Sequence, residues 1–137
     1  MKICYFTELN SRGGLETFIK NFFETKSKNN HVLVFNKNNQ NLKKIFEPKR
    51  KNISLISYDI FSFEKYQIFL NKYFFSLIYS LFFPFFFFYQ YKKLIDFFKF
   101  KDFDKLMIIN GGYPGSDICL AAVFAFRKIN QKKRNLD

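Results

Sequence analysis

The sequence contains no tryptophan, a single histidine, two cysteines and only five glycines among its 137 residues. Cys4 and Cys119 stand in apolar segments without a Cys-x-x-Cys spacing and with no histidine nearby. This pattern gives no metal site and is typical of reduced core cysteines in a cytoplasmic protein. No serine–histidine–aspartate set and no carboxylate pair at a defined spacing can be recognised, so a hydrolase is not suggested.

Acidic residues are also scarce, because 11 of them face 23 lysines and arginines and leave a net charge of +12. The positive charge gathers in segment 37–51, with a net charge of +5, and in segment 127–137, with +4. Such clusters suit an anionic membrane surface or a phosphorylated substrate, and equally well suit solvated loops. The aromatic residues form apolar runs and do not alternate with lysine and arginine, so we expect no nucleic-acid partner.

Charge is absent altogether from the 19 residues Tyr73–Tyr91, in which four phenylalanines follow Pro84. A transmembrane helix needs ~20 apolar residues. A crossing here would place the strand expected at 105–109 on the other side of the membrane from the strands before it, so we expect no span. Two interpretations stay open. The run is either a buried helix pair broken at Pro84, or a surface that lies on the inner face of the plasma membrane.

Short apolar runs alternate with helical patterns, which predicts a parallel sheet covered on both faces. The strands are expected at Lys2–Phe6, His31–Phe35, Ile53–Ser57 and Lys105–Ile109. Residues 36–52 are expected to form a loop with one helical turn. The fold class is therefore α/β, a Rossmann-like doubly wound parallel sheet with helices on both faces.

Two amphipathic helices are expected, one after each of two glycine-rich loops. The apolar side of the first is expected to hold Leu15, Phe18, Ile19, Phe22 and Phe23, with Glu16 on the opposite side. The apolar side of the second is expected to hold Ile118, Ala121, Ala122, Ala125 and Ile129. A carboxylate in the first turn of a helix stabilises it, and we assign Glu16 that role before any catalytic one.

All five glycines lie in the two loops, at Arg12-Gly13-Gly14 and at Gly111-Gly112-Tyr113-Pro114-Gly115. Each loop follows a predicted strand and opens a helix, where backbone N–H groups and the helix N-terminus favour an anionic or polar ligand. In the strand order 3-2-1-4 the first and fourth strands are neighbours, and ligands bind at the switch point between them. Both loops are therefore expected to border one crevice.

These segments resemble a known family. Residues 1–6 leading through Arg12-Gly13-Gly14-Leu15-Glu16 resemble the opening of the family-4 glycosyltransferases of the two-domain GT-B type. Residues 30–34 and 104–109 resemble further strands of that domain. The run Asn110-Gly111-Gly112-Tyr113-Pro114-Gly115, followed by Asp117, Cys119 and Ala121-Ala122, is similar to a loop in bacterial members that build surface polysaccharides. Ser116 and Leu120 depart from that subset, which often has a glycine and an arginine there.

The resemblance implies that residues 1–137 are the N-terminal, acceptor-binding domain of such an enzyme, truncated before the C-terminal domain that binds the nucleotide-sugar donor. It implies no metal and no cofactor, a glycan or lipid-linked sugar as acceptor, and no sugar transfer by this chain alone. It assigns Gly13 and Gly14 to the donor-phosphate loop. The acceptor-side loop then comprises Arg12, Asn110, Gly111, Gly112 and Tyr113.

Two other functions are kept as alternatives. One is a non-catalytic basic α/β domain that binds a membrane surface. The other is a nucleotide-binding Rossmann enzyme domain. It is disfavoured because no third glycine stands three residues after Gly13-Gly14, and because the second strand ends in Asn36-Lys37 without an acidic residue for a ribose hydroxyl. For His31 we expect a place in a loop or at a strand edge in preference to a role as general base.

Overall fold

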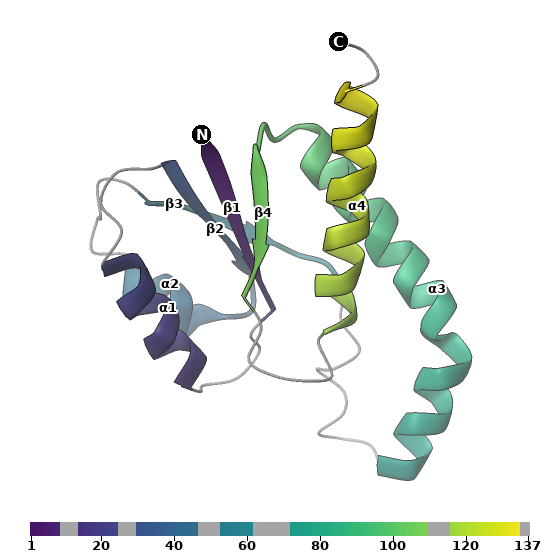
Figure 1. The fold of residues 1–137 in the computed structure, drawn as a ribbon. Helices are drawn as coiled ribbons and strands as arrows, with labels where there is room; N and C mark the ends of the chain where they lie inside the picture. The colour runs from purple at the N-terminus through teal and green to yellow at the C-terminus, as the bar shows by residue number, and fades with distance from the viewer. Residues whose placement is uncertain (9–13, 25–29, 47–52, 62–71, 110–115, 135–137) are drawn as a thin grey trace. The chain divides into compact units, whose positions relative to one another are not determined.

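The computed structural model describes residues 1–8, 14–24, 30–46, 53–61, 72–109 and 116–134. It divides into two compact units. We call residues 1–59 with 102–115 the sheet unit, and residues 60–101 with 116–137 the helical unit. Figure 1 shows the elements of both units along the chain.

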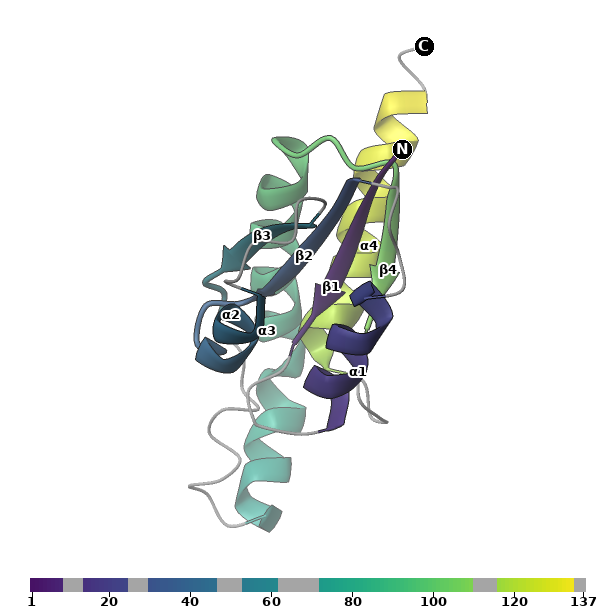
Figure 2. The same cartoon turned by 90° about the vertical axis from the view of Figure 1, so that its left-hand side faces the viewer.

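The sheet unit contains four strands, all parallel, in the order β3-β2-β1-β4 (Figure 2). Their bounds are Lys2–Thr7 for β1, Asn30–Asn36 for β2, Ile53–Tyr58 for β3 and Lys105–Ile108 for β4. The α/β class and the Rossmann-like strand order are confirmed, and each predicted strand agrees with the observed one to within one residue at either end. Short apolar runs form these strands because a parallel sheet buries its residues on both faces.

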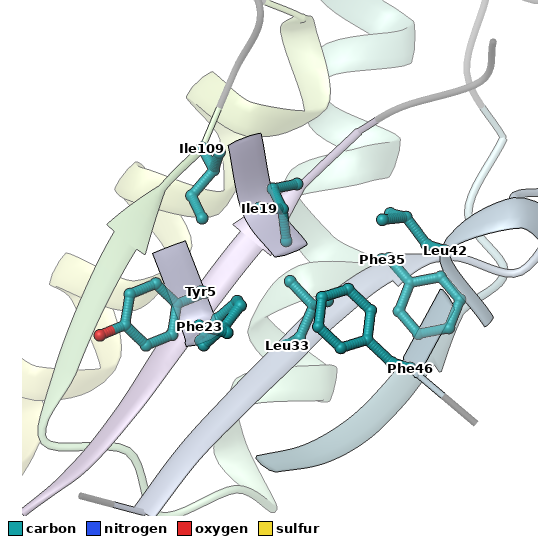
Figure 3. Packing of buried hydrophobic residues seen from close by; sticks show 8 residues of the cluster. All are labelled: Tyr5, Ile19, Phe23, Leu33, Phe35, Leu42, Phe46 and Ile109. Atoms are coloured by element: carbon teal, nitrogen blue, oxygen red, sulfur yellow. The ribbon is translucent and has the colours of Figure 1, made fainter. Parts of the chain in front are cut away.

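One face of the sheet packs against helices α1 (Gly14–Glu24) and α2 (Gln40–Phe46). Figure 3 shows the buried cluster formed there by Tyr5, Ile19, Phe23, Leu33, Phe35, Leu42, Phe46 and Ile109. Alternate strand residues point to the opposite face. They are buried as well, at Cys4, Phe6, Val32 and Val34.

The buried side of α1 differs from the predicted one. Glu16, Ile19 and Phe23 are buried, whereas Phe18 is 54% exposed. Compared with the prediction, the helix is rotated about its axis so that the Glu16 side chain is buried and the Phe18 side chain is exposed to solvent. Hydrophobic spacing alone could not identify the buried side, because Phe18 extends the apolar arc further than the sheet covers.

A second correction concerns segment 36–52, where a full helix α2 replaces the single expected turn. Asn39 begins it as the N-cap, since its Oδ1 accepts a hydrogen bond from the Leu42 N–H at 3.0 Å. Leu42 and Phe46 then enter the core from this helix. The prediction missed this helix because its apolar i, i+4 pair, Leu42 and Phe46, stands in a lysine-rich segment.

The helical unit contains helices α3 (Lys72–Lys99) and α4 (Asp117–Arg134), which run in the same direction side by side. Their aromatic rings meet at Phe87–Phe124, with centroids 6.0 Å apart, and at Phe98–Phe126, 5.6 Å apart. The predicted buried face of α4 is confirmed at four of its five positions, Ile118, Ala121, Ala122 and Ala125. Ile129 is only half-buried.

Pro84 does not break α3, contrary to one interpretation of this segment, and the helix continues through it (Figure 1). Proline removes one backbone donor, which leaves the carbonyl of Ser80 without its helical partner. Both residues are exposed, so water replaces that donor at little cost. Among the helices that the structure describes, none combines the length and the apolar character of a membrane span.

Candidate functional site

The predicted switch point lies where β1 and β4 end side by side. Phe6 is in register with Ile108, and the Ile109 N–H donates to the Phe6 carbonyl at 2.9 Å. The loops that follow both strands therefore start from neighbouring points at one edge of the sheet (Figure 2). Six of the predicted site residues lie outside the described residues, namely Arg12, Gly13, Asn110, Gly111, Gly112 and Tyr113.

Gly14 is the one predicted site residue that the structure describes, and it is the first residue of α1. Its φ lies outside the left-handed region, and a Cβ built on it would meet no atom within 4 Å. A left-handed backbone is therefore not the reason for glycine at this position. Space is open at this position at the N-terminal end of the helix, which is where an approaching ligand would need it.

Three buried polar side chains stand on either side of the loop that joins β1 to α1. Thr7 is the last residue of β1, Glu8 follows it, and Glu16 lies in the first turn of α1. Within the described residues, the Thr7 Oγ1 and the Glu16 Oε1 are buried without a hydrogen-bond partner. Buried polar atoms are normally paired, so these two are available to hydroxyl or amide donors of a ligand.

Sequence reasoning missed Thr7 and Glu8 and placed Glu16 on the exposed side of its helix. The available signal was a Thr-Glu pair directly after a buried strand that leads to a glycine-rich loop. Ligands of open α/β sheets bind outside the carboxyl ends of the strands, so such a pair falls at the expected place. We call Thr7, Glu8 and Glu16 the switch-point acceptors.

The end of β1 is fixed from the side by Tyr58, the last residue of β3. Its hydroxyl donates to the Thr7 carbonyl at 3.2 Å, and its ring stacks on Phe6 with centroids 4.9 Å apart and planes 9° apart. Tyr58 thus reaches past β2, which lies between β3 and β1, and holds the end of β1 by two independent contacts. This support preorganises the position of the Thr7 side chain.

The polar side chains at the end of β2 make local contacts within the sheet unit. The Asn36 Oδ1 accepts from the Asn38 N–H at 3.0 Å, and Lys37 forms an exposed ion pair with Asp59 at 3.3 Å. In a dinucleotide-binding domain an acidic side chain at this strand end contacts the ribose. Here Asn36 and the lysine that follows occupy the strand end, which agrees with the sequence argument against that function.

His31 is a core residue and takes no part in this site. It lies in the interior strand β2, is 2% exposed, and packs against Tyr5 and Phe23 with ring centroids 5.4 and 5.9 Å away. The expected loop or edge position is therefore wrong. The aromatic cluster around the ring explains its burial.

The buried Cys4 offers no reactive thiol. Cys4 and Cys119 are both buried and neither is in a disulfide, and burial raises the pKa of the Cys4 thiol to about 12. A thiol with so high a pKa is protonated at neutral pH and is neither a nucleophile nor a metal ligand. Among the residues that the structure describes, no group of three potential metal ligands is found.

No protein-family model, no curated protein and no solved structure matches the chain. The resemblance to family-4 glycosyltransferases therefore stays a prediction from the sequence, and the geometry of the switch point has to be interpreted from its own residues.

Proposed function

We propose that the chain is the acceptor-binding half of a glycosyltransferase that takes sugars from nucleotide-sugar donors in the synthesis of surface glycans. One observation carries the proposal. The adjacency of β1 and β4 gives both glycine-rich loops a common origin at the edge of the sheet where the switch-point acceptors lie.

The chemistry of these acceptors favours a sugar over a bare anion. Carboxylate oxygens only accept hydrogen bonds when ionised, and sugar hydroxyls are donors that suit them. Glu8 and Glu16 would repel a phosphate placed against them, so the phosphates of a donor are assigned to the backbone N–H groups of the loop before α1. The open space at Gly14 lets such a group approach the helix N-terminus.

A cytoplasmic location accompanies this proposal. Cys4 and Cys119 are buried and neither is in a disulfide, which supports a reducing compartment. The proposed role is to bind the acceptor, and binding is therefore the property that tests it.

The proposal is tested by saturation-transfer NMR of the purified chain with a neutral oligosaccharide and, separately, with a nucleotide sugar. We expect saturation of the oligosaccharide protons, and its loss by about tenfold in Glu16→Gln, because an amide replaces the carboxylate and leaves one acceptor oxygen in place of two. Glu24→Gln, an exposed position at the other end of α1, is the matched control.

Two results would contradict the proposal. Saturation confined to the nucleoside would favour the nucleotide-binding enzyme domain, and an absence of saturation for both probes would leave the switch point without a sugar site. The donor loop is tested by comparing saturation of the nucleotide sugar in Gly14→Val and in Asn21→Val, an exposed position on the same helix. Only Gly14→Val adds bulk at the N-terminal end of α1.

A further inference from the structure

Helix α3 has two sides of opposite character. Leu94 and Phe98 are fully buried, and Phe87 meets Phe124 of α4. The other side faces water with Leu77 at 70%, Leu81 at 70%, Phe85 at 74% and Phe88 at 61% exposure. Ordinary globular helices present polar residues on such a side.

The four exposed residues form one line along the helix, because their spacings of four, four and three residues return to the same side at each turn. We call Leu77, Leu81, Phe85 and Phe88 the α3 stripe. At 1.5 Å per residue it is ~17 Å long. An open apolar groove of about 470 Å³ continues it at Phe85, lined also by Phe61, Phe86 and Tyr89.

The same side of α3 turns basic where the stripe ends. Lys92 follows Phe88 by four residues and stands in line with the stripe, Lys93 lies beside it, and Lys99 follows two turns later. All three lysines are exposed, and Asp96 is the single acid on this part of the helix. An apolar segment that leads into a cluster of lysines is complementary to apolar chains beneath anionic headgroups.

We propose that the α3 stripe is a docking surface for an anionic phospholipid bilayer. The stripe enters the boundary between headgroups and acyl chains, and Lys92, Lys93 and Lys99 contact the lipid phosphates. The stripe is far shorter than the ~30 Å hydrocarbon layer, and the opposite side of α3 is occupied by α4, so the helix lies at the interface.

Charge also decides between a bilayer and a second copy of the chain. A symmetric dimer through the stripe would bring two identical lysine clusters together, on chains that each carry a net charge of +12. An anionic bilayer turns the same charge into attraction, which makes it the better occupant of this surface.

The test is co-sedimentation of the whole chain with vesicles of phosphatidylcholine alone and with vesicles that contain phosphatidylglycerol. We expect binding to the anionic vesicles and a loss of about tenfold or more in two variants, Leu81→Ser with Phe85→Ser, and Lys92→Glu with Lys93→Glu. Phe18→Ser, at an exposed phenylalanine of α1, controls for the first. Lys43→Glu with Lys44→Glu, at exposed lysines of α2, makes the same change in net charge and controls for the second.

The proposal is overturned if the controls weaken binding as much as the test variants, or if neutral and anionic vesicles bind equally. It is also overturned if sedimentation without lipid shows a dimer that Leu81→Ser with Phe85→Ser disperses. Circular dichroism must show unchanged helix content in each variant. The inference does not rest on the sugar site, since Glu16→Gln should bind vesicles like the unchanged chain.

Discussion

The two units use their aromatic residues in opposite ways. In the sheet unit, Tyr5, Phe6 and Phe35 are at most 3% exposed and fill the interior of the sheet. In α3, Phe85 and Phe88 stand mainly in water, although they belong to the most apolar run of the chain. The number of phenylalanines therefore gives no measure of the core. Whether a phenylalanine ring stabilises the fold depends on whether a neighbouring element covers it.

The largest expected effect separates a core leucine from a stripe leucine. Leu33 is fully buried in the cluster of the sheet unit, whereas Leu81 is 70% exposed. Leu33→Ala should lower the free energy of unfolding by ~2–5 kcal/mol, because it removes apolar contacts and leaves a cavity. Leu81→Ala should change it by less than ~0.5 kcal/mol. Urea denaturation followed by circular dichroism measures both.

An equal loss of unfolding free energy in the two variants would contradict this difference, since it would mean that the α3 stripe is packed in solution. A self-associated chain would give that result, and its unfolding midpoint would then depend on protein concentration.

A smaller effect is expected within the helical unit, where the Tyr79 hydroxyl hydrogen-bonds the half-buried Asp117 carboxylate. Tyr79→Phe should cost ~1 kcal/mol, while Tyr89→Phe, at an exposed ring of the same helix, should cost almost nothing. Burial raises the pKa of Asp117, and the bond from Tyr79 lowers it. Removing the hydroxyl should therefore raise this pKa further, which carbon-13 NMR of the carboxyl group can follow.

The sign of the pH dependence follows from the same shift. A carboxyl group whose pKa is higher in the folded than in the unfolded chain favours folding at acid pH and loses that contribution as the pH rises through the folded pKa. Asp117 should thus weaken the helical unit between acid and neutral pH, and more so in Tyr79→Phe. A pKa of Asp117 that falls in this variant would contradict the assigned hydrogen bond.

The smallest expected effect is a gain. Gly14→Ala should raise the free energy of unfolding by ~0.4–1 kcal/mol, because alanine restricts the unfolded chain and its Cβ has open space in α1. Differential scanning calorimetry should show a higher midpoint. A lower unfolding midpoint would mean that Gly14 adopts a backbone conformation that alanine disfavours, and would contradict the relaxed backbone at this position.

The strands were predictable because each is a short apolar run bounded by polar residues, and the order 3-2-1-4 is the usual one for such alternation. The rotation of α1 was not, since the apolar arc is wider than the surface that covers it and Phe18 lies at its margin. Helix α2 was missed because its apolar pair stands among lysines. Continuity through Pro84 depended on water reaching the carbonyl of Ser80.

At the switch point, the sequence located the two glycine-rich loops and the strand ends that carry them. It did not identify the buried acceptors, because burial of Thr7, Glu8 and Glu16 is a property of the folded chain and not of their residue types. The sequence assigned Glu16 to the exposed side on polarity alone.

The α/β class and the basic charge of the chain follow from the period of its apolar residues and from its composition, and the strand order is the usual one for such alternation. Which polar groups are buried at the end of β1, and which phenylalanines of α3 face water, depends on the folded chain. The physical reason is that periodicity fixes how side chains are distributed around an element, while burial depends on which side a neighbouring element covers.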